Sequence, residues 1–388
     1  MKGLSARLFV FVLLIFARPS YAVVSVATGD CPAARSHYSV DMPLSDVVRN
    51  KELLEKIAAI SPQAANKFAK PFGDFPLDER FGNIISPAFL FQQHIIHVDE
   101  KTKSEITRLL ESTLMTDAAK EENCARYDNI RPDIPAAENS KRILVFGKVN
   151  GFVHGEAIAA SVPAFKELAA SNSMDIFFTD KAGVFNADDL SQFNVIVWNN
   201  ISGDALTFSQ RDALKAFIVN GGGFVAVHGA GGDLQYFWDW YADELISARF
   251  TGHPMSPQFQ SARLITESKN PVLTKDLPAS FEMSEEWYSF EQSPRSKDVE
   301  VIVTIDESSY EPLGFGGQSL AMGDHPIVWA KCAGQGRVFY TAIGHKAESF
   351  SDAYAVRLLE NGLIWASSGN EGGQCADDLA TNNAGGEK

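Results

Sequence analysis

The 388-residue sequence is poor in basic side chains and in cysteine. Lysine and arginine number 34 against 49 aspartates and glutamates, which gives a formal net charge of −15. An acidic protein repels phosphate backbones and anionic lipid, so we expect neither nucleic acid nor a membrane surface as a partner. After the first 22 residues, no apolar run approaches the roughly 20 residues of a membrane span. No internal repeat is visible.

The four cysteines are Cys31, Cys124, Cys332 and Cys375. They form no CxxC pair, which excludes thioredoxin-like and c-type haem motifs. An even number in an oxidising compartment indicates disulfides, and four cysteines allow three connectivities. We favour Cys31–Cys124 with Cys332–Cys375, because each pair lies within one apparent domain. A catalytic thiol is disfavoured, since no cysteine has a histidine nearby in the sequence.

Residues 1–22 have the features of a secretory signal peptide. Lys2 and Arg7 precede an apolar core over 8–17, and Ser20-Tyr21-Ala22 is a small-x-small cleavage site. The alternative is a retained anchor helix, for which the apolar core is too short. We therefore predict a periplasmic or secreted protein with no membrane contact once the signal is removed.

The rest of the chain divides by composition. Residues 23–138 are predicted to form a mainly helical region, since 44–60 and 102–114 repeat apolar residues at helical spacing. An α/β domain is expected over 141–368 and a flexible tail over 369–388. His94 and His97 would place two ligands on one helix face. Ordinary core or surface histidines are the favoured interpretation, because no carboxylate lies beside them.

From residue 141 strands alternate with helices. Strands are predicted at 142–147, 174–179, 194–199 and 223–228, with helices at 155–170 and 207–219. Strands joined by helices need right-handed parallel crossovers, which predicts a doubly wound, mostly parallel, flavodoxin-like sheet. Further strands are expected at 262–266, 299–305, 327–330 and 337–342, before a helix at 353–365.

Five of the eight histidines lie beside glycine or proline where a predicted strand ends: His154, His228, His253, His325 and His345. The carboxyl edge of an open α/β sheet is where such folds bind ligands. Asn199 ends the third predicted strand at the same edge. Glycines such as Gly229 either make tight turns or let the backbone approach a small ligand. We favour the second interpretation for the set that flanks the histidines.

The segment Glu285-Glu286-Trp287-Tyr288 joins two acids to two aromatic residues. Such a combination suits a site that grips and protonates a polar ring. Adjacent side chains of a strand point to opposite faces, so at most one of the two glutamates faces a given pocket.

The residues from about 141 to 368 resemble the ThuA-like (trehalose-utilisation) family. The resemblance rests on GFVH, LTFSQRDALKAFIVNGGGFVAVHGA, FTGHP, EEWYSF and DHPIVW with GQGRVFYTAIGH, in that order. It implies a class I glutamine-amidotransferase-like fold and a link to bacterial carbohydrate use, including oxidised (3-keto) sugars. The preserved motif positions are His154, His228, His253, Glu286, His325 and His345. The related amidotransferases carry a cysteine nucleophile on a G-x-C-x-G turn, where this chain has AVHGA, so we reject glutaminase activity.

Two chemistries remain open for the site. In the first, His154, His228 and Glu286 act as catalytic acid and base. In the second, His154, His228, His253 and Glu286 bind a divalent metal such as zinc, although no HExxH spacing supports it and no cofactor is certain. The predicted substrate contacts are Asn199, Gly229, His253, Trp287, Tyr288, His325 and His345.

The favoured hypothesis is an enzyme, a hydrolase, lyase or isomerase, that acts on a small-molecule carbohydrate or its 3-keto derivative. The alternative is a carbohydrate-binding or accessory protein without turnover. A third hypothesis treats residues 23–138 as a partner-docking module beside the α/β scaffold. The sequence indicates no oligomeric state.

Overall fold

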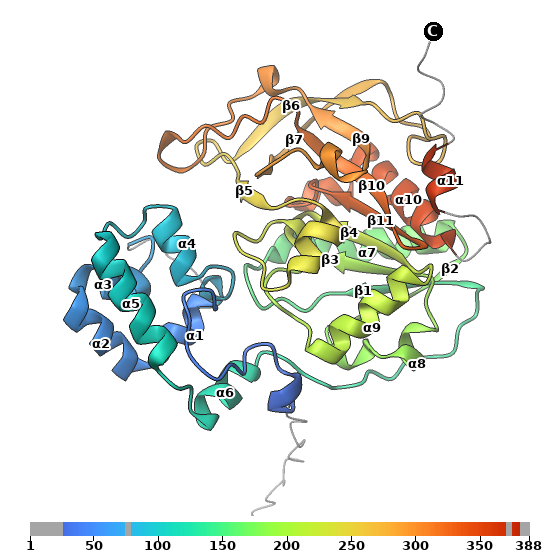
Figure 1. Cartoon of the computed structure of the whole chain (residues 1–388). Helices are drawn as coiled ribbons and strands as arrows, with labels where there is room; N and C mark the ends of the chain where they lie inside the picture. Colours follow the sequence, from blue (N-terminus) through green and yellow to red (C-terminus); the bar gives the residue numbers. More distant parts are fainter. Residues whose placement is uncertain (1–25, 74–78, 370–374, 381–388) are drawn as a thin grey trace, which may run out of the picture.

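The computed structural model describes residues 26–73, 79–369 and 375–380. The predicted signal peptide and the end of the predicted tail lie outside these residues. A helical region comes first in the chain and an α/β region follows (Figure 1). Within the described residues, no helix has the length and apolar character needed to cross a membrane.

The helical region packs around its own apolar core, which includes Leu53, Ile57, Phe68 and Leu110. Its helices are α1 (Leu44–Val48), α2 (Lys51–Ile60), α3 (Pro62–Ala69), α4 (Pro87–Gln92), α5 (Glu100–Ser112) and α6 (Asp117–Cys124). Side-chain caps set where these helices begin, because an Asn, Ser, Asp or Thr oxygen accepts a hydrogen bond from a first-turn amide.

The single helical segment expected at 44–60 is two helices. Asn50 separates them, since its side chain accepts from Leu53 N and so begins α2. His94 and His97 do not lie on a helix face. Both are exposed in the turn that follows α4, and His94 has a φ of 51°.

In the described part of the chain, nine strands form one sheet in the order β2-β1-β3-β4-β11-β10-β9-β6-β7. The strands are β1 (Lys141–Phe146), β2 (Met174–Thr179), β3 (Val195–Asn199), β4 (Gly223–Val227), β6 (Phe259–Thr266), β7 (Ser280–Glu286), β9 (Glu300–Ile305), β10 (Pro326–Ala333) and β11 (Gly336–Thr341). The pairs from β2 to β11 are parallel, and those from β11 to β7 are antiparallel.

Helices cover both faces of the parallel half. Helix α7 (Gly155–Ser171) joins β1 to β2, and α9 (Phe208–Val219) joins β3 to β4. These crossovers run in opposite directions along the sheet, so right-handed connections put the two helices on opposite faces. Helix α8 (Ala187–Leu190) packs against α9, and both α7 and α10 (Ala353–Ser367) pack against η9 (Ala347–Phe350). The expected α/β fold with a preceding helical region is confirmed.

The antiparallel half departs from the doubly wound expectation. Strand β7 and the short pair β5 (Phe250–Gly252) and β8 (Ser289–Phe290) are additional to the predicted strands. The tail expected to be flexible includes a helix, α11 (Cys375–Ala380).

All four cysteines are paired, and the pairs are the two that the sequence analysis favours. Cys31 bonds to Cys124 within the helical region, and Cys332 bonds to Cys375, which ties α11 to β10. Two disulfides are compatible with a secreted protein.

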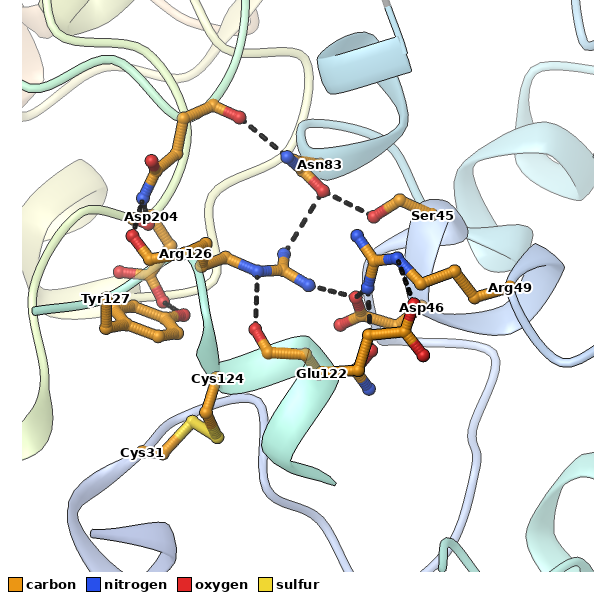
Figure 2. A network of polar contacts seen from close by, with 12 residues as sticks. Cys31, Ser45, Asp46, Arg49, Asn83, Glu122, Cys124, Arg126, Tyr127 and Asp204 are labelled. Atoms are coloured by element: carbon orange, nitrogen blue, oxygen red, sulfur yellow. Dashed lines mark hydrogen bonds and ion pairs between the residues drawn. A yellow bond between two sulfur atoms is a disulfide. The ribbon is translucent and has the colours of Figure 1, made fainter. Parts of the chain in front are cut away.

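A buried ionic network lies where the helical region ends (Figure 2). The Asp46 carboxylate is fully buried and contacts both Arg126 and Arg49. Arg126 also donates to Asn83, and Tyr127 donates to Asp204 in the α/β region at 2.7 Å. Burial raises the pKa of Asp46, and the two arginines oppose that shift. The network therefore joins the two regions, and its buried carboxylate depends on the two arginines to compensate its charge.

We predict that Arg126→Met destabilises the protein by about 3 kcal/mol, because it removes the main partner of a buried carboxylate. Lys120→Met is the control, since Lys120 pairs with the exposed Asp117 and should contribute less than about 1 kcal/mol. Urea unfolding measures both values. Equal midpoints for the two variants would contradict the importance of the network.

Candidate functional site

Four parallel strands deliver side chains to one edge of the sheet. Strands β1, β3, β4 and β11 are neighbours, and the loops that follow their carboxyl ends carry His154, Asn200, His228 and His345 respectively. His154 is the N-cap residue of α7, and His228 follows β4 directly. Parallel strands end at the same edge, so these loops meet although they are far apart in the sequence.

The carboxylate of the site comes from the other end of the sheet. Glu286 is the last residue of β7, and the loop after β11 packs against this strand end. Gly344 N donates to Glu285 Oε2 at 3.1 Å, and Lys346 Nζ donates to Ser284 O at 3.4 Å. The two glutamates therefore serve different purposes, because Glu285 fixes the loop while Glu286 contacts the histidines.

Donor atoms of His154, His228, His345 and Glu286 all lie within 4.8 Å of one another. Glu286 Oε2 is 2.8 Å from His345 Nδ1 and 3.3 Å from His228 Nε2. His228 Nε2 and His345 Nδ1 are 3.1 Å apart. The three imidazole rings and the carboxylate thus converge on a common point. We call these four residues the donor cluster.

The tautomer of His228 follows from its surroundings. Its Nδ1 lies 2.6 Å from Ala342 O, and a carbonyl oxygen can only accept a hydrogen bond. Nδ1 therefore carries a proton, and Nε2 is the nitrogen turned toward Glu286 and His345. The Tyr288 ring stacks on the imidazole with a centroid distance of 4.1 Å, which holds the plane of the ring.

Burial and the neighbouring charges shift the pKa values of the cluster. Burial lowers the pKa of His154 well below its ordinary value, and the adjacent His228 and His345 lower it further. Burial alone would raise the pKa of Glu286, but hydrogen bonds to His228 and His345 hold that pKa well below the ordinary range. Burial lowers the pKa of His345, but the hydrogen bond to Glu286 outweighs burial, so this pKa lies above its usual value. Glu286 is thus an ionised carboxylate among imidazoles.

The backbone at the strand ends is strained. His228 has a φ of 40° and Asn200 a φ of 54°, in the left-handed region that non-glycine residues seldom adopt. Asn200 bridges two loops, because its side chain accepts from Gly229 N at 3.0 Å and donates to Gly344 O at 3.2 Å. Such strain persists where surrounding contacts compensate it, and it is common at functional sites.

His253 lies beside the donor cluster and more open to solvent. Its Nδ1 is 3.2 Å from Glu286 Oε1 and 2.9 Å from Pro254 O, and 24% of its side chain is exposed. Gln258 also donates to Glu286 Oε1. The two carboxylate oxygens are therefore divided, with Oε1 facing His253 and Gln258, and Oε2 facing the cluster. The metal ligand set expected from sequence included His253, whereas the four donor atoms that lie closest together are those of His154, His228, Glu286 and His345.

Three predicted substrate-contact residues have buried side chains engaged with other partners. Asn199 donates to Ser161 Oγ, and Trp287 Nε1 donates to Gln260 O. His325 lies between Glu307 Oε1 and Tyr288 O, at 2.9 and 2.8 Å. These contacts make the three residues part of the scaffold around the site. Of the other predicted contacts, Tyr288 OH is 3.5 Å from His154 Nε2, and a Cβ at Gly229 would meet the His154 ring.

Sequence reasoning missed two aromatic residues at the site. Phe152 packs its ring edge on His154 with centroids 4.8 Å apart, and Phe259 packs on His345 at 5.1 Å. Each is 39% exposed. Phe152 lies two residues before His154 in the GFVH motif, and this proximity could have indicated that it belongs to the site. Phe259 had none, because it lies outside the FTGHP motif, five residues after Pro254.

The family model for ThuA, described as trehalose utilisation, matches residues 142–366. The chain belongs to the ThuA family. All members of the donor cluster lie within the matched residues, and the helical region lies before them.

Solved structures with the ThuA fold are similar to this chain. A ThuA-like protein of Bacteroides uniformis is 28% identical, with a TM-score of 0.53 over 63% of this chain and 98% of that one. A ThuA-like protein of Parabacteroides merdae is 20% identical, with a TM-score of 0.46 over 60% of this chain and 91% of that one. No curated protein matches the chain.

Chemically, the arrangement offers an ionised carboxylate, imidazole nitrogens held in fixed tautomers, and low local polarity. Such a site can exchange protons with a ligand and can stabilise developing charge. The cluster also has the residue types that hold a divalent metal ion. No cysteine or serine occupies the turn at His228, so covalent acyl chemistry has no nucleophile there.

We predict that Gly229→Ala displaces the His154 ring, because the added Cβ would lie 2.8 Å from its Cε1 and Nδ1. Such overpacking should cost about 1–3 kcal/mol. Gly147→Ala is the control, since a Cβ there meets nothing within 4 Å and should change stability by less than about 0.5 kcal/mol. Urea unfolding and the His154 ring signals in NMR spectra measure the two effects. Unchanged His154 signals in the Gly229 variant would contradict the geometry.

Proposed function

We propose that the protein is an enzyme that acts on a sugar or an oxidised (3-keto) sugar derivative through histidine and glutamate acid-base chemistry. The observation that carries the proposal is the convergence of an ionised Glu286 with His253 and His345, the two partly exposed imidazoles of the site. The family description, trehalose utilisation, supports a sugar as the substrate class. The predicted signal peptide and the two disulfides support action outside the cytosol.

His253 is the best-placed proton acceptor. Pro254 O can only accept a hydrogen bond, so the Nδ1 that faces it carries a proton and Nε2 carries the lone pair. Glu286 Oε1 lies 3.2 Å from the same Nδ1 and stabilises the imidazolium that forms when Nε2 takes up a proton. The pair thus has the base-and-orienter geometry of general base catalysis.

A 3-keto sugar suits this chemistry, because its carbonyl acidifies the C–H bond on the adjacent carbon. Removal of that proton by His253 Nε2 breaks the C–H bond, and the electron pair moves onto the ketone oxygen as an enolate. The enolate then expels a group from the next carbon, which is elimination. Alternatively the proton of the adjacent hydroxyl moves to the enolate oxygen and the former carbonyl carbon is protonated, which moves the ketone by one carbon and is isomerisation. Both outcomes return the proton through the same imidazole, so no further reactant is needed.

Phe152 and Phe259 support a ring-shaped ligand. Both are partly exposed, and they contact His154 and His345 respectively, whose ring centroids are 4.7 Å apart. Aromatic rings with free faces pack against the apolar C–H face of a pyranose, while polar groups bind its hydroxyls. The combination supports a carbohydrate over a small polar acid or an amide.

The test is a screen of disaccharides, glycosides and their 3-keto forms with purified protein, followed by chromatography of the products. His253→Asn preserves a hydrogen bond at the Nδ1 position and removes the base, so kcat/KM should fall at least about 100-fold. His97→Asn is the control, because His97 is an exposed histidine of the helical region. If the wild-type protein consumes none of these compounds but calorimetry detects binding, the carbohydrate-binding alternative replaces the enzyme.

We further predict that Phe152→Ala and Phe259→Ala each raise KM about tenfold and change kcat little, because stacking stabilises ground state and transition state alike. Phe208→Ala is the matched control, since Phe208 is an exposed aromatic residue on α9. Steady-state kinetics on the best compound of the screen measures both constants. Equal KM values for all three variants would rule out an aromatic sugar platform.

A further inference from the structure

We propose that His154, His228, His345 and Glu286 bind one divalent transition-metal ion, with His253 outside the coordination sphere. The binding part of this proposal rests on the donor geometry. Its catalytic part rests on the proposed function, because the ion would take the sugar ketone oxygen as a fifth ligand and stabilise the enolate charge. The assignment differs from the ligand set expected from the sequence by exchanging His253 for His345.

The donor separations suit a four-coordinate ion. With bonds of 2.0–2.2 Å at tetrahedral angles, two ligand atoms of a zinc site lie about 3.3–3.5 Å apart. The separations among His228 Nε2, His345 Nδ1 and Glu286 Oε2 are 3.1, 3.3 and 2.8 Å. His154 supplies a fourth donor within 4.8 Å of these three. Shifts of less than about 1 Å would complete the geometry.

The contacts among the cluster atoms also favour a cation at its centre. His228 Nδ1 donates to Ala342 O, so Nε2 is the ring nitrogen that faces His345 Nδ1 and Glu286 Oε2. His345 Nδ1 in turn lies 2.8 Å from Glu286 Oε2. These three atoms are of the types that ligate transition metals, and one cation between them would interact with all three.

His154 has an unsatisfied nitrogen in a buried position. Its Nδ1 has no hydrogen-bond partner, and its Nε2 has only a 3.5 Å contact with Tyr288 OH. A buried polar atom without a partner is costly and calls for an explanation such as an ion.

Hydrogen bonds to groups outside the coordination sphere orient the proposed ligands, as is usual for metal sites. Ligating histidines donate their other ring N–H to a carbonyl or carboxylate, as His228 does to Ala342 O. Ligating carboxylates are themselves hydrogen-bonded, as Glu286 is through Oε1 to Gln258. His253 uses the same Oε1, which keeps it out of the sphere that Oε2 enters. Three imidazoles with one carboxylate suit a borderline ion such as Zn²⁺ rather than Mg²⁺ or Ca²⁺.

The first measurement is elemental analysis of full-length protein purified without chelator and without a histidine tag. We expect close to one equivalent of a transition metal. Protein stripped with chelator should take up one Zn²⁺ in a calorimetric titration, and binding should raise its unfolding temperature. Less than about a tenth of an equivalent, with no shift in unfolding temperature on adding Zn²⁺ to stripped protein, overturns the proposal.

Variants then test which residues are ligands. His345→Ala should weaken Zn²⁺ binding at least about 100-fold, because the set of four loses one donor. His253→Ala is the matched comparison and should weaken binding at most about tenfold, since it deletes an imidazole that contacts Glu286 Oε1 outside the sphere. His154→Ala serves as a second ligand variant should His345→Ala fail to fold, and unfolding of the stripped forms checks this. Equal affinities for the His345 and His253 variants contradict the assignment.

These experiments distinguish failure of the metal site from failure of the proposed function. One equivalent of tightly bound Zn²⁺ without turnover of any sugar supports the metal site and contradicts the proposed function. Equal turnover by stripped and zinc-loaded protein supports the proposed function and contradicts a role of the metal in catalysis.

Discussion

The parallel pairing of β1, β3, β4 and β11 is the constraint on which the site depends. Strand β4 pairs with β3 and with β11 in registers that align Val227 with both Asn199 and Thr341. The loops that follow therefore begin at the same level, and His228 reaches hydrogen-bond distance of His345 across 117 residues of sequence. A slip of one residue would turn every side chain of β4 to the other face. The side-chain packing on both buried faces of β4 that fixes the register thus also fixes the histidines.

Glu286 reaches this edge only because the sheet continues beyond β11 as an antiparallel half. Its strand β7 is held against the loop after β11 by the Gly344 amide, which donates to Glu285, the neighbour of Glu286. A carboxylate buried this deeply is stable only with compensating partners. The surrounding imidazoles are those partners, so the pKa of Glu286 stays low in spite of its burial. The same residues therefore form the site and hold the two halves of the sheet together.

The sequence predicted the parallel half well, since 142–147 and 223–228 are continuous apolar runs separated by helices of crossover length. It did not predict β7, because only Phe281 and Met283 of Ser280–Glu286 are apolar, which is too few to show the alternation of a strand clearly. It also indicated His253 rather than His345 as a metal ligand. Both follow strands beside glycine, and only the path of each loop decides which imidazole faces Glu286 Oε2. Motifs locate the residues of such a site, whereas their assignment to roles depends on long-range packing.

The helical region lies outside the ThuA match, yet it contacts the loop that carries His154. Asn83 donates to Asn150 O at 2.7 Å, and Asn150 in turn donates to Arg126 O at 3.1 Å. A Cβ on Gly151 would lie 2.6 Å from Ile84 and 2.4 Å from Ser202, so the loop is clamped between the two regions. Phe152 and His154 follow immediately. Because the clamp is made of specific hydrogen bonds supported by the buried Asp46 network, docking of the helical region and placement of His154 are coupled. This coupling argues against a helical module with a role separate from the site.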